Sequence, residues 1–181
     1  MIIVYTGPMF AGKSTALLEE YDNIKNKASI VCFKPSKDNR DKTQIRARGV
    51  EQKVDAIVIT KFDEIPNYIN ENTKHIFIDE VQFINGNFNI LSKLSVEKDI
   101  DIYVGGLKQT SELRPFGTMP YILAIADFVI ELRAECECGK NAFYTYCKVD
   151  KKSEVLVGDK KEYIPVCREC YLKYTGGKVN G

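Results

Sequence analysis

The stretch Gly7-Pro-Met-Phe-Ala-Gly12-Lys13-Ser14-Thr15 matches the phosphate-binding pattern G-x-x-x-x-G-K-[ST]. An apolar run, Ile2–Tyr5, precedes it, and an amphipathic run, Thr15–Asn26, follows it. Strand, glycine-rich loop and helix form the context that this pattern requires. The glycines let successive backbone N–H groups face phosphate oxygens, and the helix N-terminus adds partial positive charge. The stretch therefore predicts a loop that holds the phosphates of a nucleotide.

The side chains of this loop and of one later segment suggest a metal-assisted reaction. Lys13 is expected to reach the β- and γ-phosphates, and Ser14 to ligate Mg²⁺. A second oxygen ligand is needed at the end of a neighbouring strand, and Asp79 ends the apolar run His75–Asp79. Glu80 follows directly and can accept a proton from an attacking hydroxyl or water. The expected nucleotide-binding residues are Gly7, Pro8, Met9, Phe10, Ala11, Gly12, Lys13, Ser14, Thr15, Asp79, Glu80, Val81 and Gln82, with Ser14 and Asp79 at the magnesium.

Short apolar runs alternate with longer amphipathic stretches up to about residue 132. Continuously apolar strands are typical of a mainly parallel sheet covered on both faces, so the pattern predicts an α/β domain over residues 1–132. The charge-dense stretch Pro35–Gly49 is expected to be a loop. The expected strands are Ile2–Tyr5, Ser29–Phe33, Ala56–Ile59, His75–Asp79, Asp101–Leu107 and Phe128–Leu132, and the expected helices are Thr15–Asn26 and Asn87–Lys98.

Five of the six cysteines lie in the last quarter of the chain, where the sequence becomes polar and rich in turns. Cys167-Arg-Glu-Cys170 is a C-x-x-C pair and Cys136-Glu-Cys138 is a C-x-C pair. Four thiolates suit a structural Zn²⁺, so Cys136, Cys138, Cys167 and Cys170 are the expected ligands of a small second domain, residues 133–181. Cys147 remains open as a substitute ligand. Cys32 lies in an apolar run and is expected to be a small buried residue.

Composition narrows the class of protein. The 181 residues are 44% hydrophobic and 28% charged with a net charge of +1, so no basic field suggests nucleic acid as a partner. No apolar run approaches the roughly 20 residues that span a bilayer, and the start, Met1–Gly7, lacks the positive head and small-residue cleavage site typical of a signal peptide. A cytoplasmic protein without membrane contacts is expected. Because D-x-x-G and N-K-x-D are missing from the sequence, a GTP switch is disfavoured, which leaves ATP-dependent phosphoryl transfer or ATP hydrolysis.

Five segments taken together resemble the type II thymidine kinase family. They are Gly7–Thr15, Lys37-Asp-Asn-Arg40, Asp79-Glu-Val-Gln-Phe83, Arg114-Pro-Phe-Gly117 and the terminal cysteines, and the resemblance covers about residues 1 to 172. It implies a P-loop NTPase-like sheet followed by a zinc-ribbon-like lasso domain that closes over the nucleoside. It also implies a homotetramer that uses ATP, Mg²⁺ and structural Zn²⁺ to phosphorylate the 5′-hydroxyl of thymidine or deoxyuridine.

The resemblance also implies roles for single residues. Glu80 matches the catalytic base for the 5′-hydroxyl, and Phe83 matches an aromatic wall of the base pocket. Asp38 and Arg40 match an Asp-x-Arg element near the phosphates and metal, and Tyr163 belongs to the loop that closes over the nucleoside. The implied nucleoside-binding residues are Met9, Asp38, Arg40, Phe83, Leu107, Phe116, Val155, Leu156, Val157, Gly158 and Tyr163.

Two departures from the family pattern leave the base preference open. The family reads Gly-Leu-Asp-x-x-Phe where this chain has Gly106-Leu-Lys108-Gln-Thr-Ser111. Lys108 reverses a charge near the pocket, and Ser111 removes a ring, unless Leu113 fills the space. Two alternatives therefore stand: a nucleoside kinase with altered pyrimidine preference, and a P-loop ATPase whose zinc knuckle binds nucleic acid. Balanced charge around the cysteines weighs against the second alternative.

Overall fold

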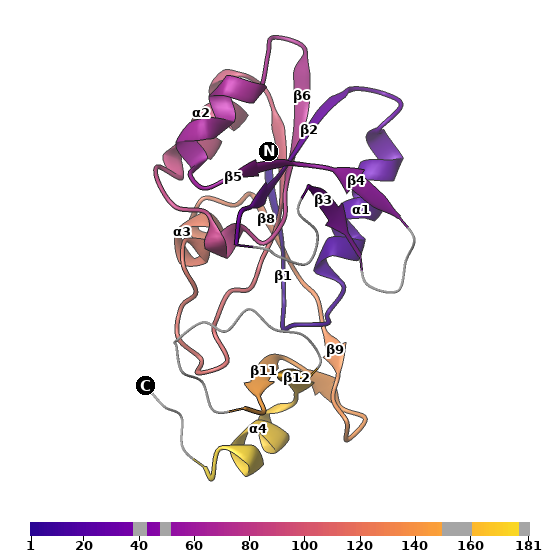
Figure 1. Ribbon diagram of the computed structural model, residues 1–181, viewed down its shortest axis with the longest axis vertical. Coiled ribbons are helices and arrows are strands. Elements are labelled where there is room, and N and C mark those ends of the chain that lie inside the picture. Colours follow the sequence, from indigo (N-terminus) through magenta and orange to yellow (C-terminus); the bar gives the residue numbers. More distant parts are fainter. Residues whose placement is uncertain (38–42, 48–51, 150–160, 178–181) are drawn as a thin grey trace.

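The computed structural model describes residues 1–37, 43–47, 52–149 and 161–177. Figure 1 shows a larger α/β part and, at one end of the long axis, a small part that we call the cysteine lobe, residues 133–149 and 161–177. Six residues with expected roles lie outside the described residues: Asp38, Arg40, Val155, Leu156, Val157 and Gly158.

A six-stranded sheet forms the centre of the α/β part. Its order is β5-β2-β6-β7-β1-β8, and every pair of neighbours is parallel. The strands are β1 (Ile2–Thr6), β2 (Ser29–Pro35), β5 (Ile57–Ile59), β6 (Thr73–Ile78), β7 (Asp101–Gly105) and β8 (Phe128–Glu131). Each corresponds to one of the six strands expected from the sequence, so the α/β class with a mainly parallel sheet is confirmed.

Helices cover both faces of the sheet. On one face lies α1 (Lys13–Ile24), whose Leu17 packs with Phe77 of β6. On the other lie α2 (Asn89–Glu97), α3 (Met119–Ala124) and the 3-10 segment η1 (Phe62–Tyr68). Ile78 of β6 belongs to this second apolar cluster. Neighbouring strand residues point to opposite faces, so an uninterrupted apolar strand supplies both layers. No helix in the part of the chain that the structure describes has the length and apolarity to cross a membrane.

The expectation of a loop over Pro35–Gly49 was wrong in part. Gln44–Arg46 is strand β3, which pairs antiparallel with β4 (Lys53–Asp55) over the face that carries α1. Ile45 is 3% exposed because it lies over α1. The sequence does not reveal this tertiary contact, because Ile45 is the one apolar residue of this three-residue strand. The hairpin also covers a fully buried lysine, Lys34, whose Nζ donates to the Gln44 carbonyl at 3.1 Å.

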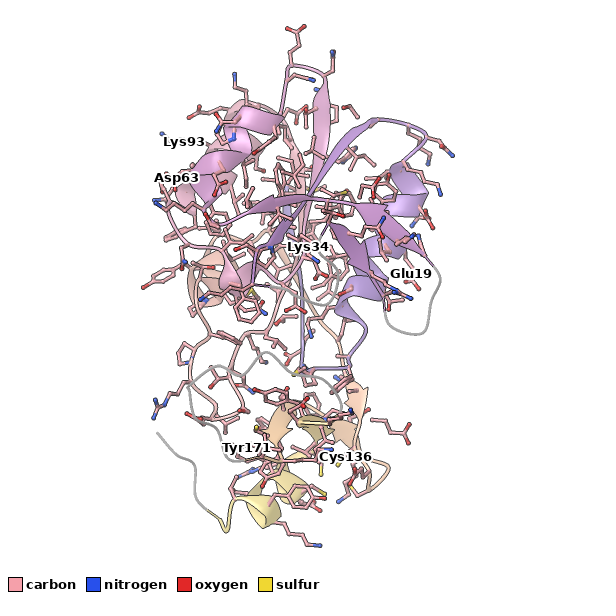
Figure 2. The ribbon with its side chains drawn as sticks, viewed as in Figure 1. Glu19, Lys34, Asp63, Lys93, Cys136 and Tyr171 are labelled. Atoms are coloured by element: carbon pink, nitrogen blue, oxygen red, sulfur yellow. The ribbon has the colours of Figure 1, made fainter. Side chains whose placement is uncertain are left out.

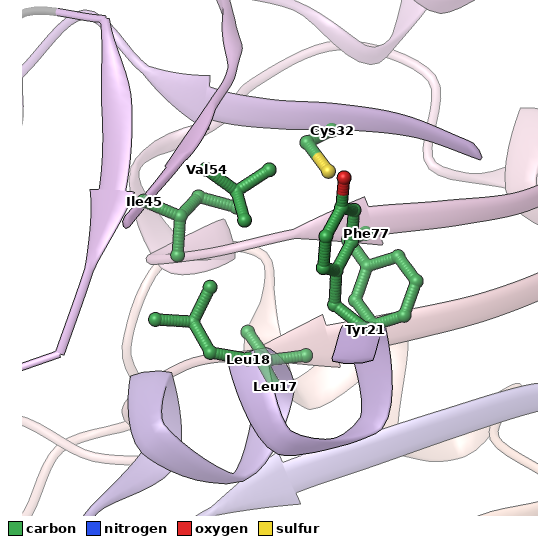
Figure 3. Close-up of a pocket in the computed structure, with 7 residues that line it drawn as sticks. All are labelled: Leu17, Leu18, Tyr21, Cys32, Ile45, Val54 and Phe77. Carbon is green, nitrogen blue, oxygen red and sulfur yellow. The ribbon is translucent and has the colours of Figure 1, made fainter. Parts of the chain in front are cut away.

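Cys32 is buried beneath this hairpin, as expected. Figure 3 shows its thiol among the side chains that line a small apolar space between α1, the hairpin and the sheet. Burial raises the pKa of the Cys32 thiol to about 12, so the group stays protonated and acts as a small apolar side chain. The residues around this space are Leu17, Leu18, Tyr21, Cys32, Ile45, Val54 and Phe77.

The cysteine lobe is built from two short hairpins and one helix. β9 (Ala134–Glu135) pairs with β10 (Asn141–Ala142), and β11 (Tyr144–Cys147) pairs with β12 (Tyr163–Val166). The helix α4 (Arg168–Tyr174) follows. The lobe has its own small apolar core, in which Ala142, Val166 and Tyr171 are 0–4% exposed.

The junction between β1 and the phosphate loop generates a stability prediction. Gly7 has φ +141°, and a Cβ added there would lie 2.3 Å from the Leu132 carbonyl oxygen, a backbone atom that cannot move aside. Gly7→Ala is expected to lower the free energy of unfolding by more than about 2 kcal/mol in a urea titration. The control is Gly176→Ala, at φ +64° with no atom within 4 Å, which should lose only about 1 kcal/mol. Equal losses of unfolding free energy in the two variants would contradict the prediction, because they would show that the backbone relieves the clash with the Leu132 carbonyl oxygen.

Candidate active site

The phosphate loop, residues 7–15, joins the end of β1 to the first turn of α1. Gly12 adopts the left-handed conformation, φ +82°, immediately before the helix. Lys13 is 7% exposed, and its Nζ donates to the carbonyl oxygens of Pro8 at 2.7 Å and Gly7 at 3.3 Å. The ammonium therefore lies over the loop, next to the N-terminus of α1, where an anion is favoured. The strand, loop and helix that the sequence motif requires are therefore all present.

Ser14, in the first turn of α1, and Asp79, which directly follows β6, meet at the carboxyl edge of the sheet. Ser14 Oγ donates to Asp79 Oδ2 at 2.8 Å. Asp79 is 4% exposed, and it has room because Gly105 ends β7 beside it. A Cβ at Gly105 would lie 2.9 Å from Asp79 Oδ1 and 2.6 Å from Leu17 Cδ1. A hydroxyl and a carboxylate side by side are hard oxygen donors of the kind that Mg²⁺ accepts.

Glu80 adopts the left-handed backbone conformation, which is uncommon for residues other than glycine. Its φ and ψ are 50° and 41°, and its N–H donates to Asp79 Oδ1 at 3.0 Å. Non-glycine residues in this left-handed region are strained and are found disproportionately at functional sites. Glu80 therefore follows Asp79 directly but lies in a turn outside strand β6.

Gln82 links Glu80 to a neighbouring loop. It lies in the 3-10 turn η2 (Val81–Phe83) and is 3% exposed. Its Nε2 donates to Glu80 Oε2 at 2.5 Å, and its Oε1 accepts the N–H of Leu107 at 3.0 Å. A buried amide with both ends satisfied holds a fixed orientation. The Glu80 carboxylate is therefore positioned relative to the loop that follows β7.

Two of the expected pocket aromatics lie together. The rings of Phe83 and Phe116 contact each other edge to face, with centroids 5.3 Å apart. Gly117 permits this approach, because a Cβ there would lie 2.0 Å from the Gln82 carbonyl oxygen. Both rings are half-buried, so they retain exposed surface. Phe83 belongs to η2, Phe116 contacts it, and Leu107 is bonded to η2 through Gln82, so three expected pocket residues are linked to this turn.

The expected residues Met9 and Tyr163 lie where the phosphate loop meets the cysteine lobe. The Met9 N–H donates to Thr145 Oγ1 at 2.9 Å. Thr145 pairs with Pro165 and Cys147 with Tyr163, so these four side chains share one face of the β11–β12 hairpin. The opposite face packs into the lobe core. Tyr163, 6% exposed, therefore lies on the side of the lobe that faces the phosphate loop.

Lys108, one of the two departures from the family pattern, forms an ion pair. Its Nζ contacts the carboxylate of Glu131 at the end of β8. The charge that the sequence places near the pocket is thus matched by an opposite charge, and the pair is partly exposed. Leu113 packs against the apolar core of the cysteine lobe, which gives this side chain a role outside the base pocket.

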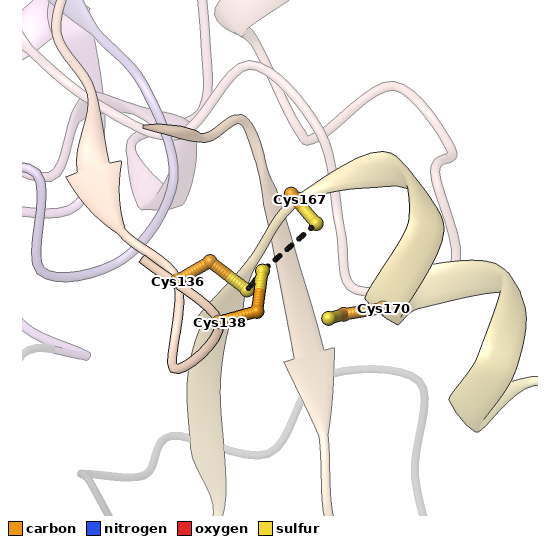
Figure 4. Close-up of side chains that lie close together, drawn as sticks. All are labelled: Cys136, Cys138, Cys167 and Cys170. Carbon is orange, nitrogen blue, oxygen red and sulfur yellow. Dashed lines mark hydrogen bonds between the residues drawn. The ribbon is translucent and has the colours of Figure 1, made fainter. Parts of the chain in front are cut away.

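Four thiols converge in the cysteine lobe, as Figure 4 shows. All four sulfur atoms lie within 4.8 Å of one another, and Cys138 Sγ is 3.5 Å from Cys136 Sγ and 3.6 Å from Cys167 Sγ. Tetrahedral zinc with Zn–S bonds of ~2.3 Å gives S–S edges of roughly 3.8 Å. Despite its shorter spacing, the C-x-C pair places two sulfur atoms where they could bind a metal ion together with those of Cys167 and Cys170.

The protonation of these thiols is uneven. Burial acts to raise the pKa of Cys136, but backbone hydrogen bonds involving Cys138 and Cys167 outweigh it and lower the pKa to about 7. Hydrogen bonds with the neighbouring thiols of Cys138, Cys136 and Cys167 raise the pKa of Cys170. A site that stabilises a thiolate at one position is suited to a cation, because a metal ion replaces the protons of all four ligands.

Cys147 is separate from this cluster. Its Sγ donates to the Val149 carbonyl at 3.3 Å, and it lies on the face of β11 opposite the lobe core. The possibility that Cys147 substitutes for a ligand was therefore wrong. Alternation along the strand explains this, since Tyr144 and Tyr146 occupy the inward positions.

Several thymidine kinases resemble this chain over most of its length. A thymidine kinase from Pseudothermotoga lettingae is 38% identical over 179 residues, which cover 95% of each chain. One from Mycoplasma mobile is 36% identical over 99% of this chain and 90% of its own, and one from Porphyromonas gingivalis is 33% identical over 95% and 85%. The family model described as thymidine kinase matches residues 1–171. The chain belongs to the thymidine kinase family.

Proposed function

We propose that this protein is an ATP-dependent thymidine kinase, which transfers the γ-phosphoryl group of ATP to the 5′-hydroxyl of thymidine or deoxyuridine. Family membership supports the reaction class. The observation that carries the proposal at the level of residues is the meeting of three groups at one edge of the sheet: the phosphate loop, the Asp79 carboxylate bonded to Ser14, and Glu80 beside it. Phosphoryl transfer requires positioned charge more than covalent chemistry, and this edge offers it.

In the proposed mechanism each group of this edge has one task. Lys13 and the N–H groups at the start of α1 bind the phosphates and stabilise the charge that develops on the transferred group. Ser14 and Asp79 would hold Mg²⁺, which when bound would offset phosphate charge. Glu80 accepts the proton of the 5′-hydroxyl as the oxygen attacks, and Gln82 keeps its carboxylate oriented. Phe83, Phe116 and Leu107 supply the apolar walls for a flat base.

We propose further that residues 1–132 form the kinase domain and residues 133–181 a zinc-bound lasso domain. The four converging thiols support Zn²⁺, with Cys136, Cys138, Cys167 and Cys170 as ligands. The ion would stabilise the fold of the lobe, because four thiolates leave no open position for a substrate. A cytoplasmic location agrees with these thiols, since reducing conditions maintain them.

A homotetramer is also part of the proposal. The sheet ends in β8, where Phe128, Val129 and Ile130 are 57%, 49% and 40% exposed. Three consecutive exposed apolar residues on an edge strand are unusual in a monomer, because such an edge readily pairs with another chain. Self-association through this edge would cover them.

The alternative of a kinase with another pyrimidine preference is favoured by one observation, the serine at position 111 where the family has a ring. The alternative of a nucleic-acid-stimulated ATPase has no comparable support, because acidic residues balance the basic residues near the cysteines. Lys140 Nζ lies 2.7 Å from Glu169 Oε2, between the two cysteine pairs.

A nucleoside panel tests the proposed function. The purified protein, with Mg²⁺ and γ-labelled ATP, is expected to phosphorylate thymidine and deoxyuridine in preference to cytidine and purine nucleosides. A higher rate with another pyrimidine would identify the altered base preference. ATP turnover that depends on added DNA or RNA, with no labelled nucleotide formed, would instead identify the ATPase.

Glu80→Gln is expected to lower kcat for thymidine by about 10²- to 10⁴-fold, the usual contribution of a general base. Thymidine affinity, measured by calorimetric titration, should change little because the shape of the side chain is kept. Glu97→Gln, at the exposed end of α2, is the matched control and should retain the original rate. An unchanged kcat with a raised KM would show that Glu80 binds the nucleoside instead.

Elemental analysis of the purified protein is expected to find about one Zn²⁺ per chain. Cys167→Ser should lose the ion and lower the melting temperature, because metal binding contributes directly to the folding of small lobes. Cys147→Ser is the control and should keep the ion, since this thiol lies outside the cluster. Zinc lost equally in both variants would contradict the proposed ligand set.

A further inference from the structure

Tyr171 of the cysteine lobe is bonded to the loop that follows β7. Its hydroxyl donates to the Ser111 carbonyl oxygen at 2.9 Å. The side chain is 4% exposed, and its ring contacts those of Tyr144 and Tyr146 in the lobe core. Figure 2 shows Tyr171 in the lower part of the molecule, in the same lobe as Cys136. Because the acceptor is a backbone atom, this contact does not depend on the side chain at position 111.

The segment that Tyr171 contacts is joined internally by backbone hydrogen bonds. We call residues 107–116 the acceptor loop. The Thr110 N–H donates to the Arg114 carbonyl at 2.9 Å, and the Phe116 N–H donates to the Lys108 carbonyl at 3.2 Å. Leu113 anchors the tip of this loop in the lobe core. Its two ends carry Leu107 and Phe116, the apolar walls of the proposed nucleoside site.

The same lobe makes a second buried contact, with the phosphate loop. Thr145 is 5% exposed, and its Oγ1 accepts the Met9 N–H at 2.9 Å. β11, which carries Thr145, and α4, which carries Tyr171, pack against each other around the Tyr144 and Tyr171 rings. One small lobe therefore contacts both loops that border the proposed site.

We propose that the cysteine lobe is a clamp that sets the position of the two substrate loops, with Tyr171 positioning the acceptor loop and Thr145 positioning the phosphate loop. The identity of the substrates rests on the function proposed above. The contacts of Tyr171 with Ser111 and of Thr145 with Met9 do not depend on that function. Tyr171 follows Cys170 directly, and Cys167 and Cys170 flank the first turn of α4. Zinc held by these thiols would therefore fix the direction in which the Tyr171 hydroxyl points.

The two tethers predict opposite kinetic patterns, which a general loss of stability would not produce. Tyr171→Phe is expected to raise KM for thymidine by about 3- to 10-fold, the effect of one lost hydrogen bond, with KM for ATP within about twofold of the original value. Thr145→Val should raise KM for ATP by a similar factor and change that for thymidine little. Thr145→Ser keeps the hydroxyl and should restore the original values.

Hydrogen exchange tests the clamp without any catalytic readout. Amide exchange in the acceptor loop should accelerate by about 3- to 10-fold in Tyr171→Phe and on removal of zinc, and stay unchanged in Thr145→Val. Tyr174→Phe is the control, because Tyr174 packs on Tyr146 at the lobe surface, 37% exposed. It should behave as the original protein does.

The possible outcomes separate this proposal from the proposed function. Unchanged exchange in the acceptor loop of a folded Tyr171→Phe protein would overturn the clamp, whatever the enzyme phosphorylates. Equal changes in both KM values in either variant would overturn the assignment of one tether to each loop. A protein that phosphorylates no nucleoside would contradict the proposed function, while the exchange measurement would still decide whether the tether operates.

Discussion

The hydrogen bond between the Ser14 hydroxyl and the Asp79 carboxylate joins the two segments on which the proposed chemistry depends. Ser14 belongs to α1, which the phosphate loop connects to β1, and Asp79 follows β6. β7 lies between these strands in the sheet, and its last residue is a glycine, so the carboxylate can reach across. The position of Glu80 then follows from Asp79, because its N–H is bonded to Asp79 Oδ1. A shift of either strand would displace all of these groups together.

Much of this architecture is encoded locally and could be predicted. The six apolar runs became the six strands of one sheet, because continuous apolarity over a few residues is enough to identify a strand covered on both faces. Glycines and a lysine at fixed spacing identified the phosphate loop for a similar reason. The thiol pairs were recognisable from their short spacing in the sequence. In the structure, the turn around Gly139, at φ +80°, brings Cys136 and Cys138 together even at C-x-C spacing.

Contacts between distant segments could not be predicted. Ile45 lies in a short polar stretch and becomes a core residue only because α1 lies beneath it. Gln82 carries no sequence signal for its double role between Glu80 and Leu107. Tyr171 and Thr145 are an aromatic and a threonine in a strand-rich, cysteine-bearing region, where packing is the default interpretation. Their hydrogen bonds to Ser111 and Met9 join segments 60 and 136 residues apart, and no local pattern encodes such pairings.

The glycine that ends β7 has an evolutionary consequence. The smallest possible side chain at position 105 would press on Leu17 in the core and on the Asp79 carboxylate at once. At many sites of an enzyme, a mutation that lowers stability can raise activity, or the reverse. Position 105 allows no such trade-off, because a single added Cβ would disturb the packing of Leu17 and the position of the Asp79 carboxylate together. A lineage that lost this glycine could regain the proposed activity only by rebuilding the first helix and the end of β6 together.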